Sequence, residues 1–188
     1  RLQIPYRLAL RQFQIDIAKC IAHIKEDLSQ IRTGRATPEL VEDVMVNAYE
    51  TSSPLKNLAS INALDAKTVI IQPWDKSILD NISKAINSAN LGFSPITEGD
   101  RVLVKIPDLT EERRREYVKV MKERIEDGRV AVRQVRQKYM KEIDEAQKEG
   151  FSEDEADRLR EEIEKEVKSA NTTIEDIREE KEKDLLTI

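Results

Sequence analysis

Residues 129–167 decide the fold of this chain, and they read RVAVRQVRQKYMKEIDEAQKEGFSEDEADRLREEIEKEV. On either side of Gly150, apolar residues recur at steps of three and four, which is the spacing of one helix face. Gly150 favours a left-handed helix end, and Ser152 is a good N-cap for the helix that follows. The stretch therefore predicts a helical hairpin whose two apolar faces need partners.

The helices of this hairpin extend in both directions, and a third amphipathic helix stands near the start of the chain. Thr110, followed by two acids, is a candidate N-cap for a helix that runs to about Glu149, roughly 60 Å at 1.5 Å per residue. Gly128 is the one weak position in its apolar face. Three such helices predict a bundle. The apolar positions are Leu10, Phe13, Ile17, Ile21, Ile24, Leu28 and Ile31, then Val118, Met121, Ile125, Val132, Val135, Tyr139, Ile143 and Ala146, then Leu159, Ile163, Val167, Ala170, Ile174, Ile177 and Leu185.

The segment between the first and second of these helices, residues 36–108, has a different pattern. It holds five of the six prolines, and its apolar and β-branched residues favour strands at 44–49, 68–72 and 101–106. Asp75 is a candidate N-cap for a short helix between the last two strands. The segment therefore predicts a small α/β domain.

Together these patterns predict an α+β protein of two domains. A three-helix bundle of residues 1–35 and 109–188 is interrupted by the α/β domain, residues 36–108. Because the chain both leaves and re-enters the bundle, two linkers join the domains, and we expect them to act as a two-stranded hinge. The expected hinge residues are Gly34, Ala36, Thr37, Pro38, Pro107 and Asp108.

Composition excludes several classes of protein. The 188 residues carry a formal net charge of -5, with 37% charged and 4% aromatic residues, which is typical of long helices. A single Cys and a single His exclude a disulfide framework and a histidine-based metal site. No apolar run reaches the roughly 18 residues of a membrane span, and no phosphate-binding glycine loop or nucleophile motif is present. We expect a protein that is not an enzyme, with no cofactor and no metal.

Three single residues have a structural interpretation. Cys20 is interpreted as a small, partly buried hydrophobe and His23 as a surface or boundary histidine. Trp74 stands at a strand-to-helix turn, and we expect it to be a core or staple residue rather than a partner contact.

The charge distribution leaves two interpretations open. From Gly128 to Lys141 the long helix carries five cations and no acid, and Arg129, Arg133 and Arg136 share one helix face. Arg32 and Arg35, placed at the end of the first helix, are expected to face together in the same way. The arginines either form a stripe that binds RNA phosphates, or they form a solvated face that pairs with acids on neighbouring helices. On charge alone, the acid-rich chain favours the second interpretation.

Four separated strings carry a resemblance. Residues 31–38 read IRTGRATP, residues 54–59 PLKNLA, residues 109–114 LTEERR and residues 129–133 RVAVR. In this order they resemble the ribosome recycling factor family, and the resemblance extends from about Ile15 to the end of the chain. It implies an L-shaped protein in which an elongated three-helix bundle carries a small α/β domain on a two-stranded hinge.

The resemblance also implies a function. After peptide release, such a factor binds the large ribosomal subunit, and elongation factor G with GTP then drives the subunits apart so that they can be reused. By motif position, the ribosomal RNA contacts would be Arg32, Arg35, Arg129, Arg133 and Arg136, which reverses the preference for a solvated face. The alternative is a non-catalytic helical scaffold or adaptor.

Partners and location follow from the same resemblance. The expected partners are ribosomal RNA of the large subunit and elongation factor G, with no membrane contact and a monomeric chain. The absence of a long basic presequence favours a bacterial cytoplasm, while an organellar stroma or matrix stays open. Two features depart from the family pattern. One is Gln137, where family members often have a basic residue, and the other is the first dozen residues.

Overall fold

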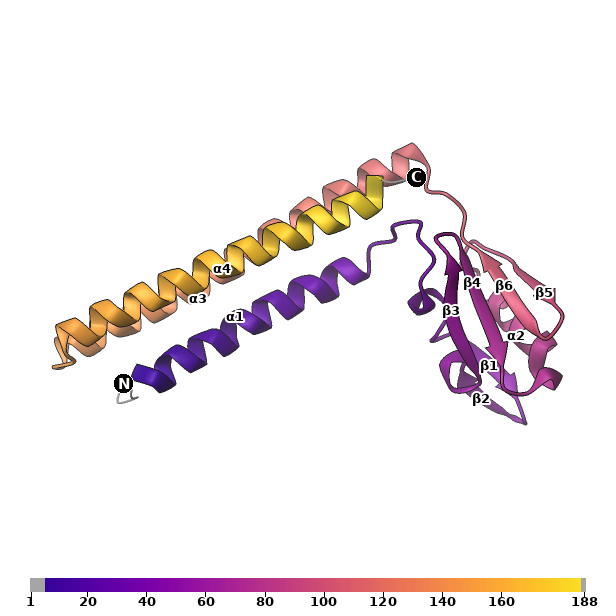
Figure 1. The fold of residues 1–188 in the computed structure, drawn as a ribbon, viewed down its shortest axis with the longest axis horizontal. Coiled ribbons are helices and arrows are strands. Elements are labelled where there is room, and N and C mark those ends of the chain that lie inside the picture. Colours follow the sequence, from indigo (N-terminus) through magenta and orange to yellow (C-terminus); the bar gives the residue numbers. More distant parts are fainter. Residues whose placement is uncertain (1–5, 187–188) are drawn as a thin grey trace. The chain divides into compact units, whose positions relative to one another are not determined.

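The computed structural model describes residues 6–186, which fold as two compact units. One unit contains the chain up to Arg32 and from Glu111 onward, and the other contains Thr33–Thr110. The first holds the long helices α1 (Tyr6–Ser29), α3 (Glu111–Lys148) and α4 (Glu153–Leu186), and the second holds a small antiparallel sheet with a helix (Figure 1). The predicted α+β class is confirmed.

The first unit is a helical bundle in which each of the three helices packs against the other two. Helices α3 and α4 run side by side over nearly their whole length (Figure 1). The apolar faces expected from the sequence are the faces that meet: their central positions are buried, and the positions at the edges of the faces are half-buried. The largest fully buried side chains of this core are Phe13, Ile24, Met121, Ile125, Ile143, Leu159, Ile163 and Ile174.

Gly128 is not a weakness of α3 but the position at which the Ile24 side chain of α1 packs directly against the α3 backbone. A Cβ at this position would lie 2.2 Å from Cδ1 and 2.4 Å from Cγ1 of Ile24, whose side chain is buried. Atoms cannot approach to that distance, so only glycine leaves room for the isoleucine. The helix therefore contains its least favourable residue where packing requires it.

The turn between α3 and α4 forms as the sequence indicates. Gly150 has a φ of 101°, which ends α3 in a left-handed conformation. The amide of Phe151 donates to the carbonyl of Ala146 at 3.0 Å, and the amide of Ala156 donates to the carbonyl of Ser152 at 2.9 Å as the first bond of α4. The reversal thus lets the two apolar faces meet.

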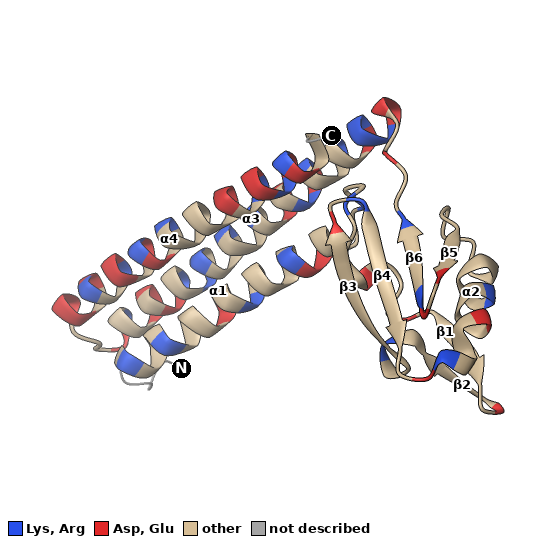
Figure 2. Cartoon of the chain, turned by 45° about the vertical axis from the view of Figure 1, so that its right-hand side comes forward, with Lys and Arg blue, Asp and Glu red and all other residues tan. Residues whose placement is uncertain are grey.

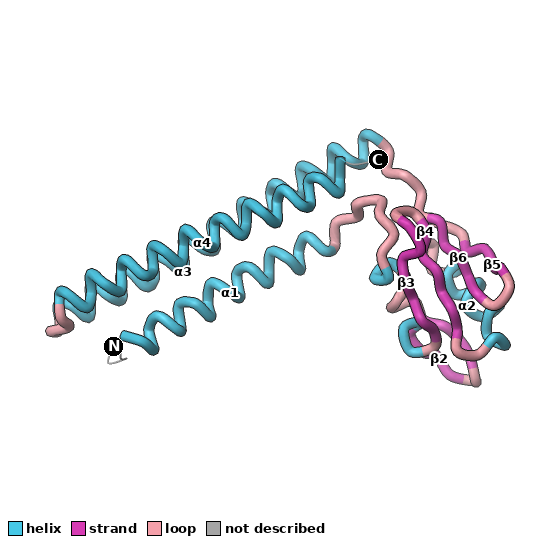
Figure 3. Tube along the Cα trace, viewed as in Figure 1, coloured by secondary structure: helices cyan, strands magenta, loops and turns pink. Residues whose placement is uncertain are grey.

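The second unit is built on a four-stranded antiparallel sheet with the order β3-β4-β6-β5 (Figure 3). Its strands are β3 (Ala59–Asp65), β4 (Thr68–Pro73), β5 (Pro95–Glu98) and β6 (Arg101–Lys105), and a separate hairpin contains β1 (Met45–Ala48) and β2 (Thr51–Pro54). Three short 3-10 helices, Pro38–Leu40, Leu55–Asn57 and Lys76–Ile78, complete this part of the described chain.

Helix α2 (Leu79–Ser88) contacts the hairpin strand β1 and the strands β5 and β6. Ile82 and Ile86 of α2 are fully buried in one core with Val69 and Ile71 of β4 and with the inward residues of β6. As predicted, Asp75 caps the segment that leads into α2, because its carboxylate accepts from the amide of Ser77 at 2.9 Å.

The sequence predicted β1, β4 and β6 but not β2, β3 and β5. The three missed strands carry mostly exposed or half-buried residues, and β2 and β5 each contain a proline. Such strands lie at edges, where packing on the sheet rather than local pattern determines their conformation.

Candidate nucleic-acid interface

The three arginines in the middle of α3 lie on one flank of the helix. At 100° per residue, positions 129, 133 and 136 fall within an arc of about 60°. Their side chains are 36%, 58% and 39% exposed, respectively. The sequence placed them correctly beside, and not within, the buried face of α3.

Each of these arginines forms an ion pair with a carboxylate of the same unit. Arg129 Nη2 lies 2.8 Å from Glu175 Oε2 and Arg136 Nη2 lies 2.5 Å from Glu164 Oε1, both of which belong to α4. Arg133 Nη2 lies 2.7 Å from Oε1 of Glu126, two turns earlier in α3. Figure 2 shows the resulting proximity of basic and acidic positions along α3 and α4.

Both interpretations of the stripe therefore have a structural counterpart. The cross-helix pairs are those of a solvated face, yet a guanidinium has five N–H donors and the side chains stay partly exposed. Exposed pairs of this kind are worth about 0.2–1 kcal/mol. An RNA phosphate can replace such a partner.

Glu175 is shared between two arginines. Its pKa is held below the usual value chiefly by a hydrogen bond from Arg178, with further contributions from the charges of Arg178 and Arg129. Arg178 Nη2 lies 2.5 Å from Glu175, and Arg178 also pairs with Glu182. Glu175 is thus part of a small charge network on α4, whereas Glu164 pairs only with Arg136 among the arginines of the described chain.

Arg32 and Arg35 do not share a helix face, because α1 ends at Ser29. Both side chains are exposed, but Arg32 ends the first unit and Arg35 belongs to the second. Gly34, with a φ of 73°, separates them, and this left-handed conformation is incompatible with continued helix. The helical spacing assumed for this pair was wrong.

The chain just before Arg32 is fixed to the bundle. Lys181 of α4 donates from Nζ to the carbonyl oxygen of Ile31 at 3.0 Å, and burial lowers the pKa of this lysine. This hydrogen bond ties the chain that follows α1 to α4 and so fixes the backbone position at which Arg32 starts.

All six expected hinge residues fall within the second unit, in two linkers that comprise residues 33–38 and 107–110. Lys67, in the turn between β3 and β4, connects the linkers. Its Nζ donates to the carbonyl of Gly34 at 2.8 Å and lies 2.6 Å from Oδ1 of Asp108. The sequence analysis missed Lys67, and a lone lysine in a hairpin turn gave no signal of this role.

Backbone contacts hold the first linker further. Ala36 is buried, and its amide donates to the carbonyl of Ala66 at 2.9 Å. A Cβ at Gly34 would lie 3.3 Å from Cγ of Leu109 in the second linker. Any other residue at position 34 would have to adopt the left-handed backbone and displace the Leu109 side chain slightly, so glycine suits this approach of the two linkers.

Trp74 is 70% exposed, so the expectation of a core or staple residue was wrong. In β4 the residues Val69, Ile71 and Pro73 point inward, and the alternation of a strand directs the next residue outward. The residue after it, Asp75, accepts a hydrogen bond from the hydroxyl of Tyr49 at the tip of the β1–β2 hairpin.

Cys20 and His23 have the structural surroundings expected for them. Cys20 is half-buried, and burial followed by the charge of Asp16 raises the pKa of its thiol. His23 is 73% exposed and lies 3.4 Å from Asp27 one turn later. Neither arrangement provides an activated nucleophile.

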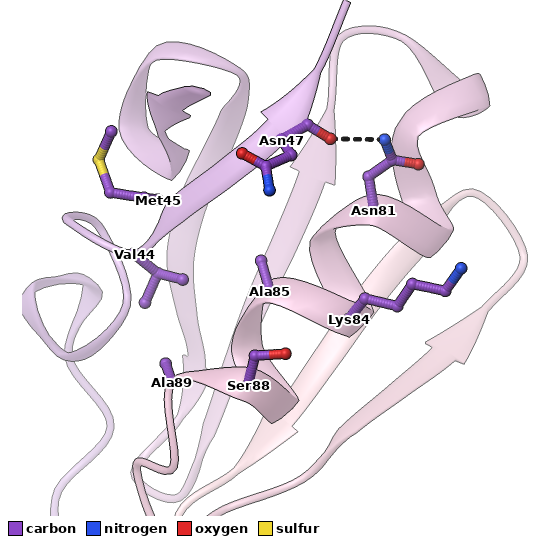
Figure 4. A pocket seen from close by; sticks show the side chains of 8 residues that line it. All are labelled: Val44, Met45, Asn47, Asn81, Lys84, Ala85, Ser88 and Ala89. Atoms are coloured by element: carbon purple, nitrogen blue, oxygen red, sulfur yellow. Dashed lines mark hydrogen bonds between the residues drawn. The ribbon is translucent and has the colours of Figure 1, made fainter. Parts of the chain in front are cut away.

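A hollow beside α2 has no acid–base pair either. This pocket of about 470 Å³ lies between β1 and α2, and Asn81 crosses it to donate to the carbonyl of Asn47 at 2.7 Å (Figure 4). Lys84 is its one titratable side chain, and Val44, Met45, Ala85, Ser88 and Ala89 complete the wall.

Metal-binding clusters and membrane-spanning helices are both absent from residues 6–186. Within this range, no group of three or more His, Cys, Asp or Glu side chains is arranged to hold a metal ion. In the same described part, no helix combines the length and apolar character needed to cross a membrane.

Known proteins similar to this chain agree among themselves. The family model described as Ribosome recycling factor matches residues 24–186. The ribosome-recycling factor of Bifidobacterium longum (strain DJO10A) is 39% identical over 178 residues, which cover 94% of this chain and 97% of that protein. That of Halothermothrix orenii is 40% identical over 171 residues, which cover 90% and 92%.

Solved structures give the same result. The solution structure of a ribosome recycling factor is 33% identical with a TM-score of 0.75, covering 99% of this chain and all of that one. Models of the T. thermophilus ribosome recycling factor and E. coli elongation factor G bound to the E. coli post-termination complex match at 32% identity and a TM-score of 0.65, covering 97% of this chain and all of the matched chain. With a family match over most of its length and relatives near 40% identity, the chain belongs to the ribosome recycling factor family.

Proposed function

We propose that this protein, together with elongation factor G and GTP, splits post-termination ribosomes into subunits so that they can be reused. The observation that carries the proposal is the family match over residues 24–186, which includes all five candidate RNA-binding arginines. A structural relative with 32% identity is described together with elongation factor G on the post-termination complex, which supports the same partners here.

In the proposed mechanism the bundle is the anchor. Arg129, Arg133 and Arg136 bind backbone phosphates of large-subunit RNA, because a planar guanidinium can grip two phosphate oxygens at once. Arg32 and Arg35 add contacts at the end of the bundle and in the first linker. The stripe is short, so the affinity comes from few phosphates and falls with salt.

The second unit transmits the push of elongation factor G. The chain passes between the units twice, at Arg32–Thr33 and at Thr110–Glu111. Two crossings permit rotation but limit separation. The expected hinge residues, Gly34 to Pro38 with Pro107 and Asp108, lie next to these crossings. The contacts of Lys67 with both linkers support a common pivot for them.

The protein performs no chemistry in this account, since GTP is hydrolysed by its partner. It acts as a monomer in the bacterial cytoplasm, binds the large subunit and elongation factor G, and needs no cofactor. A helical scaffold that uses its arginines only for internal pairs is the competing function, and the ion pairs to Glu164 and Glu175 are the observation that favours it.

A splitting assay separates the two. Post-termination ribosomes are incubated with the protein, elongation factor G and GTP and are then sedimented through sucrose. The proposal predicts conversion to subunits that depends on all three additions. If the ribosomes stay intact while a known recycling factor splits them in a parallel reaction, the recycling function is refuted and the scaffold function remains.

A further inference from the structure

The three arginines of the stripe on α3 are already paired with glutamates of the same protein, which then compete with any other anion for them. Arg129 pairs with Glu175, Arg136 with Glu164, and Arg133 with Glu126, at 2.5–2.8 Å. We propose that Glu126, Glu164 and Glu175 compete with RNA phosphate for these arginines and so keep the protein's grip on the ribosome weak enough for release. This inference rests on the proposed function, because it concerns the regulation of the same contact.

The competition follows from chemistry shared by the two ligands. A carboxylate and a phosphate each offer a guanidinium two acceptor oxygens, in nearly the same geometry. The acids of α4 are also accessible: Glu164 and Glu175 border an open hollow of about 500 Å³ and are 48% and 40% exposed. The arginines can therefore change partner without any unpacking of the bundle.

The two cross-helix pairs are not equally easy to open. When Arg129 leaves Glu175, this carboxylate keeps Arg178 at 2.5 Å, so its charge stays compensated. When Arg136 leaves Glu164, that carboxylate has no second arginine. Glu164 is therefore the stronger competitor, and its removal has the larger effect on binding.

The middle arginine is held differently. Between Glu164 and Glu175, the residues of α4 that line the same hollow include Lys168 and Asn171, which offer no carboxylate. Arg133 pairs along α3 with Glu126, which also lies 3.9 Å from Arg129. Glu126 thus lowers the positive potential of two arginines, while Arg133 is the most exposed of the three.

The test measures binding of the full chain to isolated bacterial large ribosomal subunits by cosedimentation at two salt concentrations. Glu164→Gln and Glu175→Gln remove the charge and keep the side-chain size. Glu161→Gln is the matched control, because Glu161 is an exposed acid of the same helix that pairs with none of the three arginines. Arg133→Ala and Arg136→Ala report on the RNA contact itself, and circular dichroism checks that every variant keeps its helices.

The expected result is an affinity gain of about two- to five-fold for Glu164→Gln at low salt, a smaller gain for Glu175→Gln and none for Glu161→Gln. The variants with a gain also lose affinity more steeply with salt and leave the subunit more slowly. Wild-type affinity in Glu164→Gln, or an equal gain in Glu161→Gln, overturns the counterion proposal while the proposed function stands. Wild-type affinity in both arginine variants refutes the contact between these arginines and RNA, and the counterion proposal with it, whereas the proposed function is decided separately by the splitting assay.

Discussion

Gly128→Ala sets two measurable effects against each other. In a helix interior, alanine is more favourable than glycine by about 1 kcal/mol. At this position, however, the new methyl would lie 2.2 Å and 2.4 Å from the two outer carbons of Ile24. Ile24 is buried and β-branched, so it cannot swing aside freely, and overpacking of this kind costs about 1–3 kcal/mol. We expect a net destabilisation of about 1 kcal/mol.

A double-mutant cycle isolates the clash. Ile24→Ala alone destabilises the bundle by about 2–5 kcal/mol because it leaves a cavity. It also removes both crowding carbons, so that the Cβ of residue 24 is the remaining atom near the new methyl, at 3.8 Å. In this background Gly128→Ala should therefore stabilise the bundle by about 1 kcal/mol.

The assay is thermal unfolding followed by circular dichroism at 222 nm, where the long helices dominate the signal. For a chain of this size, a change of 1 kcal/mol shifts Tm by about 2–4 °C. We expect a lower Tm for Gly128→Ala alone, and a higher Tm when Gly128→Ala is added to Ile24→Ala. A higher Tm for the single variant would refute the close approach of α1 and α3 at Gly128.

Three further predictions concern other parts of the molecule. Lys67→Met removes the link between the two linkers and should speed amide hydrogen exchange there by up to about tenfold, with exchange in α2 unchanged; equal exchange in both proteins contradicts it. The pKa of Tyr139 is raised, by burial first and then by Asp16. The neutral Tyr139 side chain therefore stabilises the folded protein fully at pH values below the usual tyrosine pKa near 10, and this contribution to stability is lost as the pH rises above that value. Urea unfolding from pH 9 to 11 should show a larger loss in the wild type than in Tyr139→Phe, because Tyr49, whose pKa is also raised, is present in both proteins. Trp74→Ala should change the unfolding free energy by less than about 0.5 kcal/mol, and iodide should quench the native fluorescence as strongly as the unfolded; strong protection would contradict the exposure of this side chain.

Local patterns predicted the bundle almost completely. A helix face repeats within a few residues of sequence, so the positions around Phe13 and Ile125 and the turn at Gly150 could be identified without knowledge of what packs on them. Gly128 shows the limit of this reasoning. Propensity marks glycine as a weakness, and only the partner helix reveals that the glycine makes room for Ile24.

The candidate site depends more on contacts that are distant in sequence. The sequence placed Arg129, Arg133 and Arg136 on one flank of a helix, but Glu164 and Glu175 belong to another helix and no spacing rule relates them to these arginines. The assumed pairing of Arg32 and Arg35 failed because α1 already ends at Ser29 and because Gly34, between the two arginines, has a left-handed backbone. Lys67 was missed because its two partners, Gly34 and Asp108, are brought to it only by the fold.

In the proposed function, the arginine flank of α3 faces RNA of the large subunit. Gln137 is exposed on α3, one residue after Arg136, and an iron chelate attached to Gln137→Cys, in a chain with Cys20→Ser, would generate hydroxyl radicals beside the stripe. With the labelled protein bound to large subunits, we expect localised cleavage of the ribosomal RNA that disappears when unlabelled protein competes. Bound protein that leaves the ribosomal RNA uncut from this position would contradict it.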